Sequence, residues 1–274
     1  MRILLLGHRE IASNIALNLL VRSLPGHELR IALSGVGDKH GPDAVPDLVE
    51  LDKVEQAMCD ALDSGVVAGS ALPPGLLGFE ALAVKTGQAL EVLADPNSDT
   101  GLEMLRDWAP ELILSVRYRK ILHQKAISIP PKGILNLHSG LLPDFRGVMA
   151  TFHSLLAGSD KIGSTLHLIT DSGIDTGPII ATCPIDADYE ATYLDNVFRL
   201  YPIGCAAMVA AVNQLAIGKI LIKKEKTGDG VYFSAPTLEL CTDFREAGLR
   251  LCDGRELERI IPRLLYRADI TSLD

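Results

Sequence analysis

The sequence predicts an α/β fold in which a mostly parallel sheet is covered by helices on both faces. Short, continuous apolar runs recur along residues 1–217, and segments with apolar residues at helical spacing separate them. Continuous apolar runs are typical of strands that are buried on both faces of a sheet. Strands that alternate with helices form right-handed βαβ units, which place the strands parallel to one another.

The N-terminal half supplies the first strands of this sheet. Residues 2–7 form an apolar run that ends in a glycine, and apolar residues recur at helical spacing from Ile11 onward. Pro110 separates a later helix from the strand that follows it, because proline fits poorly inside either element. No element is assigned to residues 64–88, where Gly and Pro interrupt the pattern. We expect strands at 2–7, 28–34, 89–94 and 111–116, and helices from residue 11 and at 48–63 and 99–108.

The second half continues the same alternation and then changes character. A strand holds Asn136 and His138, and a loop at 171–177 joins two further strands. A long apolar helix follows. Beyond Gly218 the predicted elements become short strands and short amphipathic helices. We therefore expect a main domain at 1–217 and a small C-terminal α+β subdomain at 218–274. Helices are expected at 119–127, 149–157, 192–217, 238–251 and 255–265, and later strands at 163–169, 178–185, 219–226 and 231–233.

Composition and charge exclude several classes of protein. The chain of 274 residues has no apolar stretch of 18 residues and no signal-peptide pattern, so we expect a soluble, cytoplasmic protein without membrane contact. Its five cysteines are scattered without metal-ligand spacing, which argues against a disulfide framework and against a bound metal. The net charge is −9, and residues 219–274 hold ten basic and ten acidic residues, so nucleic acid is not an expected partner.

A carboxamide and an imidazole stand two residues apart in an apolar run. Side chains alternate between the two faces of a strand, so Asn136 and His138 should share one face. Both groups can donate hydrogen bonds to an oxygen that gains negative charge, and an imidazole also transfers protons near neutral pH, so the pair suits acyl transfer. Asp171 and Asp175 lie in a glycine-containing loop that offers a carboxylate partner. Taken alone, such residues more often form structural hydrogen bonds and turns.

Three motifs in order place the chain beside a known family. They are Ile134-Leu-Asn-Leu-His-Ser-Gly-Leu-Leu-Pro-Asp-Phe-Arg-Gly, Gly163-Ser-Thr-Leu-His and Asp171-Ser-Gly-Ile-Asp-Thr-Gly-Pro-Ile-Ile. Together with the start at Gly7-His-Arg-Glu-Ile-Ala, they strongly resemble the folate-dependent formyltransferases over roughly residues 1–215. That family includes methionyl-tRNA formyltransferases, glycinamide ribonucleotide formyltransferases and sugar N-formyltransferases.

The resemblance implies a Rossmann-like formyltransferase domain at 1–217 that binds 10-formyltetrahydrofolate as co-substrate. It implies a catalytic Asn-His-Asp triad at Asn136, His138 and Asp175, with direct formyl transfer through a tetrahedral intermediate. The candidate residues for the folate pocket are Val116, Tyr118, Ile121, Leu122, Asp171, Ser172, Gly173 and Ile174. The candidate residues for the acceptor are His8, Gly140 and Arg146.

Three neighbouring features carry further expectations. Family members commonly have His-Pro-Ser, whereas this chain has His138-Ser139-Gly140, which puts the placement of the acceptor in doubt. We interpret His167 as a packed structural histidine. Arg117 and Arg119 flank the presumed folate site but also fit salt bridges to an acidic surface.

The acceptor is inferred by elimination. The C-terminal part is shorter and less basic than is normal for methionyl-tRNA formyltransferases, and longer than is usual for glycinamide ribonucleotide enzymes. A small-molecule amine remains, either a nucleotide-linked amino sugar or a hydroxyornithine-type amine. Methionyl-tRNA formyltransferase and 10-formyltetrahydrofolate hydrolase stay as alternatives, a non-catalytic binding protein is disfavoured, and homodimerisation through the extension is left open.

Overall fold

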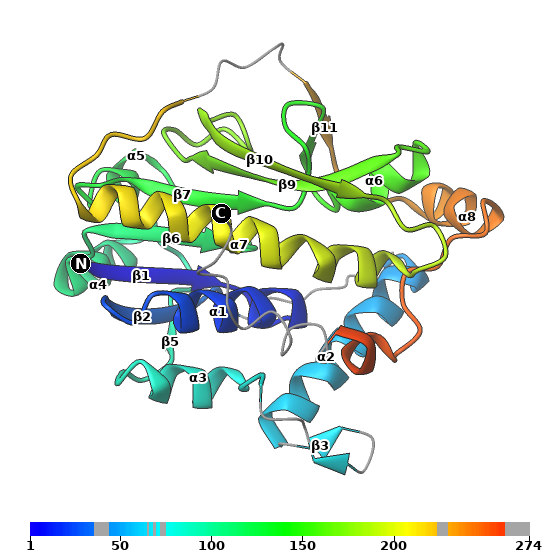
Figure 1. The fold of residues 1–274 in the computed structure, drawn as a ribbon, viewed down its shortest axis with the longest axis horizontal. Coiled ribbons are helices and arrows are strands. Elements are labelled where there is room, and N and C mark those ends of the chain that lie inside the picture. Colours follow the sequence, from blue (N-terminus) through cyan, green and yellow to red (C-terminus); the bar gives the residue numbers. More distant parts are fainter. Residues whose placement is uncertain (36–43, 65, 68–69, 72–74, 224–229, 261–274) are drawn as a thin grey trace.

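The computed structural model describes residues 1–35, 44–64, 66–67, 70–71, 75–223 and 230–260, and its centre is a mostly parallel sheet (Figure 1). In this part of the chain the sheet has seven strands in the order β10-β9-β7-β6-β1-β2-β5. The five strands from β7 to β5 pair in parallel, and β9 and β10 extend the sheet antiparallel. The strands are β1 (Arg2–Gly7), β2 (Glu28–Leu33), β5 (Glu91–Val92), β6 (Leu112–Val116), β7 (Ile134–His138), β9 (Lys161–Leu168) and β10 (Ile179–Asp186).

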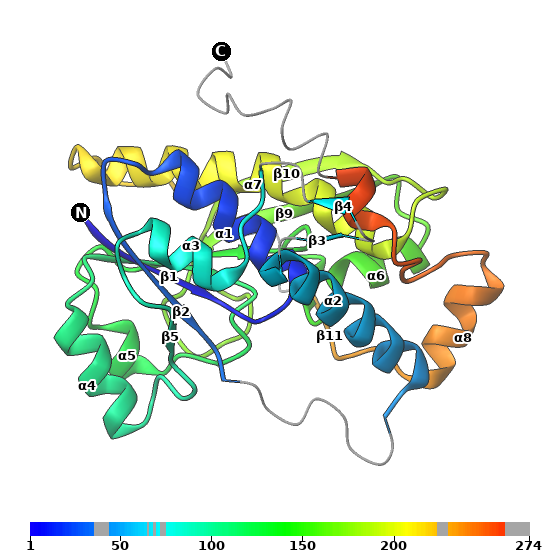
Figure 2. The same cartoon turned by 90° about the horizontal axis from the view of Figure 1, so that it is seen from below.

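Helices cover both faces of this sheet, as the sequence predicts (Figures 1 and 2). One large apolar cluster joins alternate strand residues such as Leu5 and Leu135 to α1 and α7, and a second joins Leu4 and Ile113 to α4 and α5. Each strand residue therefore serves one of two cores. The helices are α1 (Ile11–Ser23), α2 (Pro46–Ser64), α3 (Phe79–Lys85), α4 (Asp99–Trp108), α5 (Gln124–Ile127), α6 (Ala150–Leu156), α7 (Tyr193–Ala216) and α8 (Leu238–Glu246).

Among the described residues, two short strand pairs lie outside the main sheet. One is antiparallel, between β3 (Val66–Val67) and β4 (Ser70–Ala71). The other is parallel and joins residues far apart in sequence, β8 (Phe145–Gly147) and β11 (Val231–Phe233). The chain beyond α7 thus returns to the segment that follows β7.

Several predicted elements are shorter than expected. The strand at 89–94 forms only Glu91–Val92, because it lies at the edge of the sheet, where β2 is its one partner among the described residues. The helix at 119–127 begins only at Gln124, since Arg117 adopts a left-handed backbone (φ 56°) that turns the chain away after β6. Helix α8 ends at Glu246, because Gly248 follows with φ 78°.

The expectations for the C-terminal part meet a mixed outcome. Residues 219–223 are not a strand, and 224–226 lie outside the described residues. The expected helix at 255–265 is helical at 256–260, and the rest also lies outside the described residues. Phe244 of α8 stacks on Phe152 of α6 with ring centres 4.4 Å apart, so this part packs into the main core. The domain boundary at 217/218 stays a prediction.

The described helices lack a segment both long and apolar enough to cross a bilayer. The longest of them, α7, continues through Pro202 and Gly204, residue types at which helices can kink. Its N-terminus is closed by a capping box in which Thr192 and Asp195 satisfy each other's backbone N–H groups.

Candidate active site

Asn136 and His138 lie on one face of β7, as the alternation of a strand predicts. Leu135 and Leu137 point into the core beneath α1 and α7, and the two polar side chains take the opposite face. That face is covered by α4 and α5 near Ile134, but the cover ends before the carboxyl end of the strand. The polar pair therefore stands where ligands bind in open α/β sheets.

Asp175 completes the predicted triad. Its Oδ2 lies 3.3 Å from Nδ1 of His138 and accepts a hydrogen bond of 2.9 Å from the backbone N–H of Gly147. On the other edge of the imidazole, Nε2 lies 2.7 Å from the carbonyl oxygen of Phe145, to which it donates when protonated. Asp175 adopts a left-handed backbone (φ 54°), an uncommon conformation for a non-glycine residue, which is found at functional sites.

Burial and charge give this pair opposite titration behaviour. Burial lowers the pKa of His138 below its usual range, although the Asp175 carboxylate and the Phe145 carbonyl oppose that effect. Burial alone would raise the pKa of Asp175, but His138, His167 and the Gly147 amide together lower it to about 2. Near neutral pH the site thus holds an ionised carboxylate beside a neutral imidazole that can accept a proton.

His167, which the sequence indicated to be a packed structural histidine, is buried and lies beside the predicted triad. It pairs with Asn136 in the register of β7 and β9, and its Nε2 lies 3.0 Å from Nδ2 of Asn136 and 3.3 Å from Oδ1 of Asp175. Its Nδ1 lies 3.1 Å from the carbonyl oxygen of Leu168. One carboxylate therefore bridges two buried imidazoles, and His167 links that carboxylate to the Asn136 amide.

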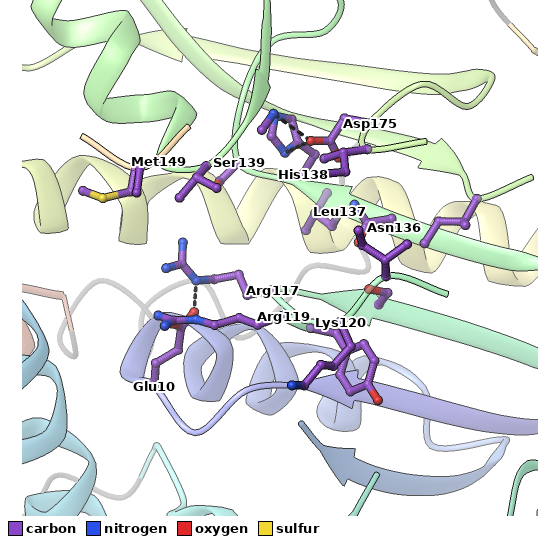
Figure 3. A pocket seen from close by; sticks show the side chains of 18 of the residues that line it. Glu10, Arg117, Arg119, Lys120, Asn136, Leu137, His138, Ser139, Met149 and Asp175 are labelled. Atoms are coloured by element: carbon purple, nitrogen blue, oxygen red, sulfur yellow. Dashed lines mark hydrogen bonds and ion pairs between the residues drawn. The ribbon is translucent and has the colours of Figure 1, made fainter. Parts of the chain in front are cut away.

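These groups lie on the wall of a cavity of about 810 Å³, drawn from close by in Figure 3. A cavity of this size accommodates a small-molecule co-substrate together with part of a second reactant. Ser139 and Met149 line the same wall as His138. Ala235 and Pro236, which follow β11, also line it.

The wall across from His138 and Asp175 carries a charged cluster (Figure 3). The side chain of Glu10 is fully buried and accepts hydrogen bonds from Nε of Arg117 and Nη2 of Arg119. Glu10 is the N-cap of α1, directly after the turn that follows β1. Glu10 is not among the residues predicted for the site, although an acidic residue in the first strand-to-helix turn was a usable signal.

The structure brings most of the predicted folate-pocket residues to the cavity. Tyr118 is buried and donates its hydroxyl to the Leu93 carbonyl oxygen at 2.6 Å, and Ile121 is 47% exposed. Val116 does not reach the cavity wall, because as the last residue of β6 it is fully buried in the core. The predicted residues that line the cavity are Tyr118, Ile121, Leu122, Asp171, Ser172, Gly173 and Ile174.

The predicted acceptor residues are not brought to the cavity wall. His8 is buried and its Nδ1 lies 2.7 Å from the Ser34 hydroxyl. A side chain at Gly140 would collide with the His138 ring and with Ala150, so this glycine allows close packing behind the imidazole. Arg146 donates hydrogen bonds to the Ile174 carbonyl oxygen at 3.0 and 3.2 Å, which ties β8 to the loop that carries Asp175.

Comparison with known proteins places this geometry in a family. The family model described as formyl transferase matches residues 92–212. A methionyl-tRNA formyltransferase from Acidithiobacillus ferrooxidans is 30% identical over 246 residues, which are 80% of this chain and 74% of that protein. One from Halorhodospira halophila is 37% identical over 135 residues, 48% of this chain and 42% of that protein. The chain spans about half the length, or less, of the first curated relatives that it matches.

Solved structures support the same fold. A glycinamide ribonucleotide transformylase from Symbiobacterium toebii has a TM-score of 0.59 at 19% identity, covering 82% of this chain and 92% of that one. A sugar N-formyltransferase from a Shewanella species has a TM-score of 0.57 at 16% identity, covering 90% and 87%. Fold, motifs and sequence identity agree, and the chain belongs to the formyl transferase family.

Proposed function

We propose that this protein transfers a formyl group from 10-formyltetrahydrofolate to the amine of a small molecule. The observation that carries the proposal is the arrangement of Asn136, His138 and Asp175 on one wall of the 810 Å³ cavity. A carboxamide donor, a neutral imidazole and an ionised carboxylate are the groups that amine attack on a formyl carbon requires.

The cavity suits the folate donor on its apolar side. Ile121, Val148 and Ile174 line the cavity and expose 47%, 44% and 37% of their surface, so a flat pterin ring would cover apolar area there. Gly173 and its neighbours add backbone groups that can pair with the polar edge of such a ring. The family to which the chain belongs supports this choice of donor.

The proposed chemistry needs no covalent bond to the protein. The acceptor nitrogen bonds to the formyl carbon, the bond from that carbon to the folate nitrogen breaks, and the amine proton ends on the departing nitrogen. One N–H of the Asn136 amide faces His167, and its second N–H is left to stabilise the formyl oxygen as negative charge develops. The His138–Asp175 pair takes up the amine proton and returns it to the leaving group.

A small, charged acceptor fits the opposite wall. Arg117 and Arg119 are held by one buried carboxylate, so their guanidinium groups are fixed before a ligand arrives. Asp52 and Glu55 of α2 line the same cavity, which makes this wall mixed in charge. Nucleotide-linked amino sugars and hydroxyornithine-type amines carry charged groups that such a wall can bind.

A transfer-RNA acceptor is the second candidate. It is favoured by the relative from Acidithiobacillus ferrooxidans, a methionyl-tRNA formyltransferase matched over 74% of its length. It is disfavoured by the net charge of −9, since binding of a polyanion depends on Lys and Arg side chains that neutralise phosphates.

One assay separates these functions. The protein is incubated with 10-formyltetrahydrofolate and, in turn, with nucleotide-linked amino sugars, hydroxyornithine and methionyl-tRNA, while tetrahydrofolate release and acceptor mass are followed. We expect a gain of one formyl group on a small amine. Formylation of methionyl-tRNA alone supports the second candidate, release without an acceptor supports a hydrolase, and no release under any condition contradicts formyl transfer.

A substitution tests the role of the imidazole. In His138→Ala the proton acceptor is lost, so we expect turnover to fall by at least about 100-fold. Circular dichroism and the unfolding temperature serve as controls for folding. Near-normal turnover in a folded variant would exclude His138 as the proton-transfer group.

A further inference from the structure

His138 and Asp175 each form a hydrogen bond to the backbone of the same short strand. The Phe145 carbonyl oxygen lies 2.7 Å from His138, and the Gly147 amide donates to Asp175 at 2.9 Å. Both residues belong to β8, which lies outside the main sheet. The orientation of His138 and the position of Asp175 therefore depend on where β8 is held.

The partner of β8 comes from the C-terminal part of the chain. In the described residues β8 pairs with β11, in a register that sets Val231 beside Phe145 and Phe233 beside Gly147. The pairing continues beyond the strand, because the N–H of Val148 donates to the Phe233 carbonyl oxygen at 2.9 Å. We call residues 230–236 the strap.

Ring contacts of Phe233 add to the backbone pairing of β8 and β11. The Phe233 ring stacks on Phe145, with centres 5.7 Å apart, and on His153 of α6, with centres 4.4 Å apart. His153 Nε2 also lies 3.2 Å from the Ser234 carbonyl oxygen. The strap is thus fixed to a helix of the main fold and to the strand that it pairs with.

Two glycines show how closely the segments approach. A side chain at Gly147, whose φ is 96°, would collide with the Phe233 carbonyl oxygen. A side chain at Gly230, whose φ is 67°, would collide with the Pro143 carbonyl oxygen. Both positions need a residue without a Cβ atom. The close contact between the strap and residues 143–147 therefore depends on one glycine in each of the two segments.

We propose that the strap is a positioning element of the active site, in which Phe233 holds β8 where Phe145 and Gly147 orient His138 and Asp175. The strap also reaches the cavity itself, because Ala235 and Pro236 line it. The C-terminal segment then contributes to turnover without supplying a catalytic group. The inference rests on the proposed function only for its kinetic readout.

The first test measures the strap directly by hydrogen exchange. In Phe233→Ala we expect the amides of Gly147 and Val148 to exchange at least about tenfold faster, while the amides of Leu4 to Leu6 in β1 keep their rates. Val231→Ala is the matched control, because Val231 lies on the same strand with its side chain 55% exposed. Phe233→Leu, which keeps apolar volume and loses both ring contacts, replaces Phe233→Ala if that variant does not fold.

The second test measures the consequence for the site. We expect kcat for formyl transfer to fall by about 10- to 100-fold in Phe233→Ala, with the KM for the folate donor changed less than about twofold, since small misplacements of a reacting group have effects of this size. In the same variant, NMR titration should place the pKa of His138 closer to its ordinary value, because burial is what lowers it.

The possible outcomes separate the two proposals. The first outcome is faster exchange confined to Gly147 and Val148, with a shifted pKa of His138, in a protein that formylates none of the amines. This outcome would support the positioning role of the strap and reject the proposed function. Unchanged exchange rates at Gly147 and Val148 in Phe233→Ala, together with wild-type kcat, would contradict the positioning role of the strap. Faster exchange to the same degree in β1 and β8 would also overturn it, because the loss would then be general destabilisation.

Discussion

At the scale of single residues, the site is a chain of groups that restrain one another. Asp175 faces His138 with one carboxylate oxygen and His167 with the other, and His167 reaches Asn136. A carboxylate that bridges two imidazoles is ionised well below neutral pH, with its pKa lowered to about 2. The negative charge of Asp175 then helps His138 take up a proton, in opposition to burial.

Replacing Asp175 with asparagine should change the pH dependence of turnover. In the proposed mechanism the neutral imidazole is the proton acceptor, so kcat should fall as the pH falls through the pKa of His138, which burial lowers from its usual range. Asp175 raises this pKa, whereas His167 and Arg117 lower it. In Asp175→Asn we therefore expect the acid limb of the kcat profile to move to lower pH, and the plateau to fall by about 100-fold.

The control for this profile is Asp186→Asn, an exposed carboxylate at the end of β10 that pairs with Lys161. Its acid limb should coincide with that of the wild type. An acid limb that stays in place in Asp175→Asn would show that the limb reports a group other than His138.

His167→Ala tests the link between the carboxylate and the amide. The variant removes the partner of the Asn136 amide and one of the two imidazoles at Asp175, so the amide can rotate away from the formyl oxygen. We expect kcat to fall by about tenfold, with a smaller effect than in His138→Ala. Steady-state kinetics checks this, and wild-type kcat would return His167 to a packing role.

At the scale of elements, the position of β7 depends on how tightly α7 packs against it. Gly204 of α7 lies against Leu137 of β7 and Ser164 of β9, where a Cβ atom would be 2.5 Å from the serine oxygen. The glycine allows the helix to approach the strand whose other face carries Asn136 and His138. Its role is close packing.

Gly204→Ala should therefore destabilise the fold although alanine favours helices. An added methyl group in a filled core costs about 1–3 kcal/mol, which exceeds the gain of about 1 kcal/mol from helix propensity. Urea unfolding measures the difference. Gly26→Ala is the matched control, since a Cβ there meets nothing within 4 Å, and equal stability of the two variants would argue against close packing at Gly204.

At the scale of the whole molecule, segments from both ends of the chain build one structure. Glu10 near the N-terminus, β7 in the middle and Pro236 beyond β11 all line one cavity. Phe244 of α8 is fully buried against Phe152 of α6, with ring centres 4.4 Å apart. We infer that α8 and the main fold unfold together.

Phe244→Ala checks this coupling. Removing a buried aromatic ring costs about 3–5 kcal/mol, and we expect the main unfolding transition to shift as a single cooperative step. Scanning calorimetry follows the transition, with Leu238→Ala as control because Leu238 is 56% exposed. A separate early transition, with the main one unmoved, would instead support an independent subdomain at 218–274.

Much of the fold was predictable because its signals are local. Buried strands such as Leu112–Val116 are continuous apolar runs, and the helix Asp99–Trp108 has the predicted bounds because Ser98 caps it and Ala109 ends it with a left-handed backbone. Elements that lack such local determinants were mispredicted. Residues 89–94 yield a two-residue edge strand, and 119–127 form a helix only from Gln124.

The sequence by itself determined which residues share the face that we propose to be catalytic. Side chains alternate between the two faces of β7, which places Asn136 and His138 on the same face. The resemblance to the family motifs indicated Asp175 as their partner. These conclusions follow from the covalent spacing of neighbouring residues and from resemblance across three motifs.

Only the tertiary structure decided what surrounds that face. His167 reaches Asn136 because β9 pairs antiparallel with β7, and Phe233 reaches Gly147 because a distant strand pairs with β8. Neither contact has a signal in local spacing, since strand register and the meeting of distant segments are set by the packing of the whole chain. The sequence could therefore indicate the groups that we propose to react, while the groups that hold them in place emerged only from the folded structure.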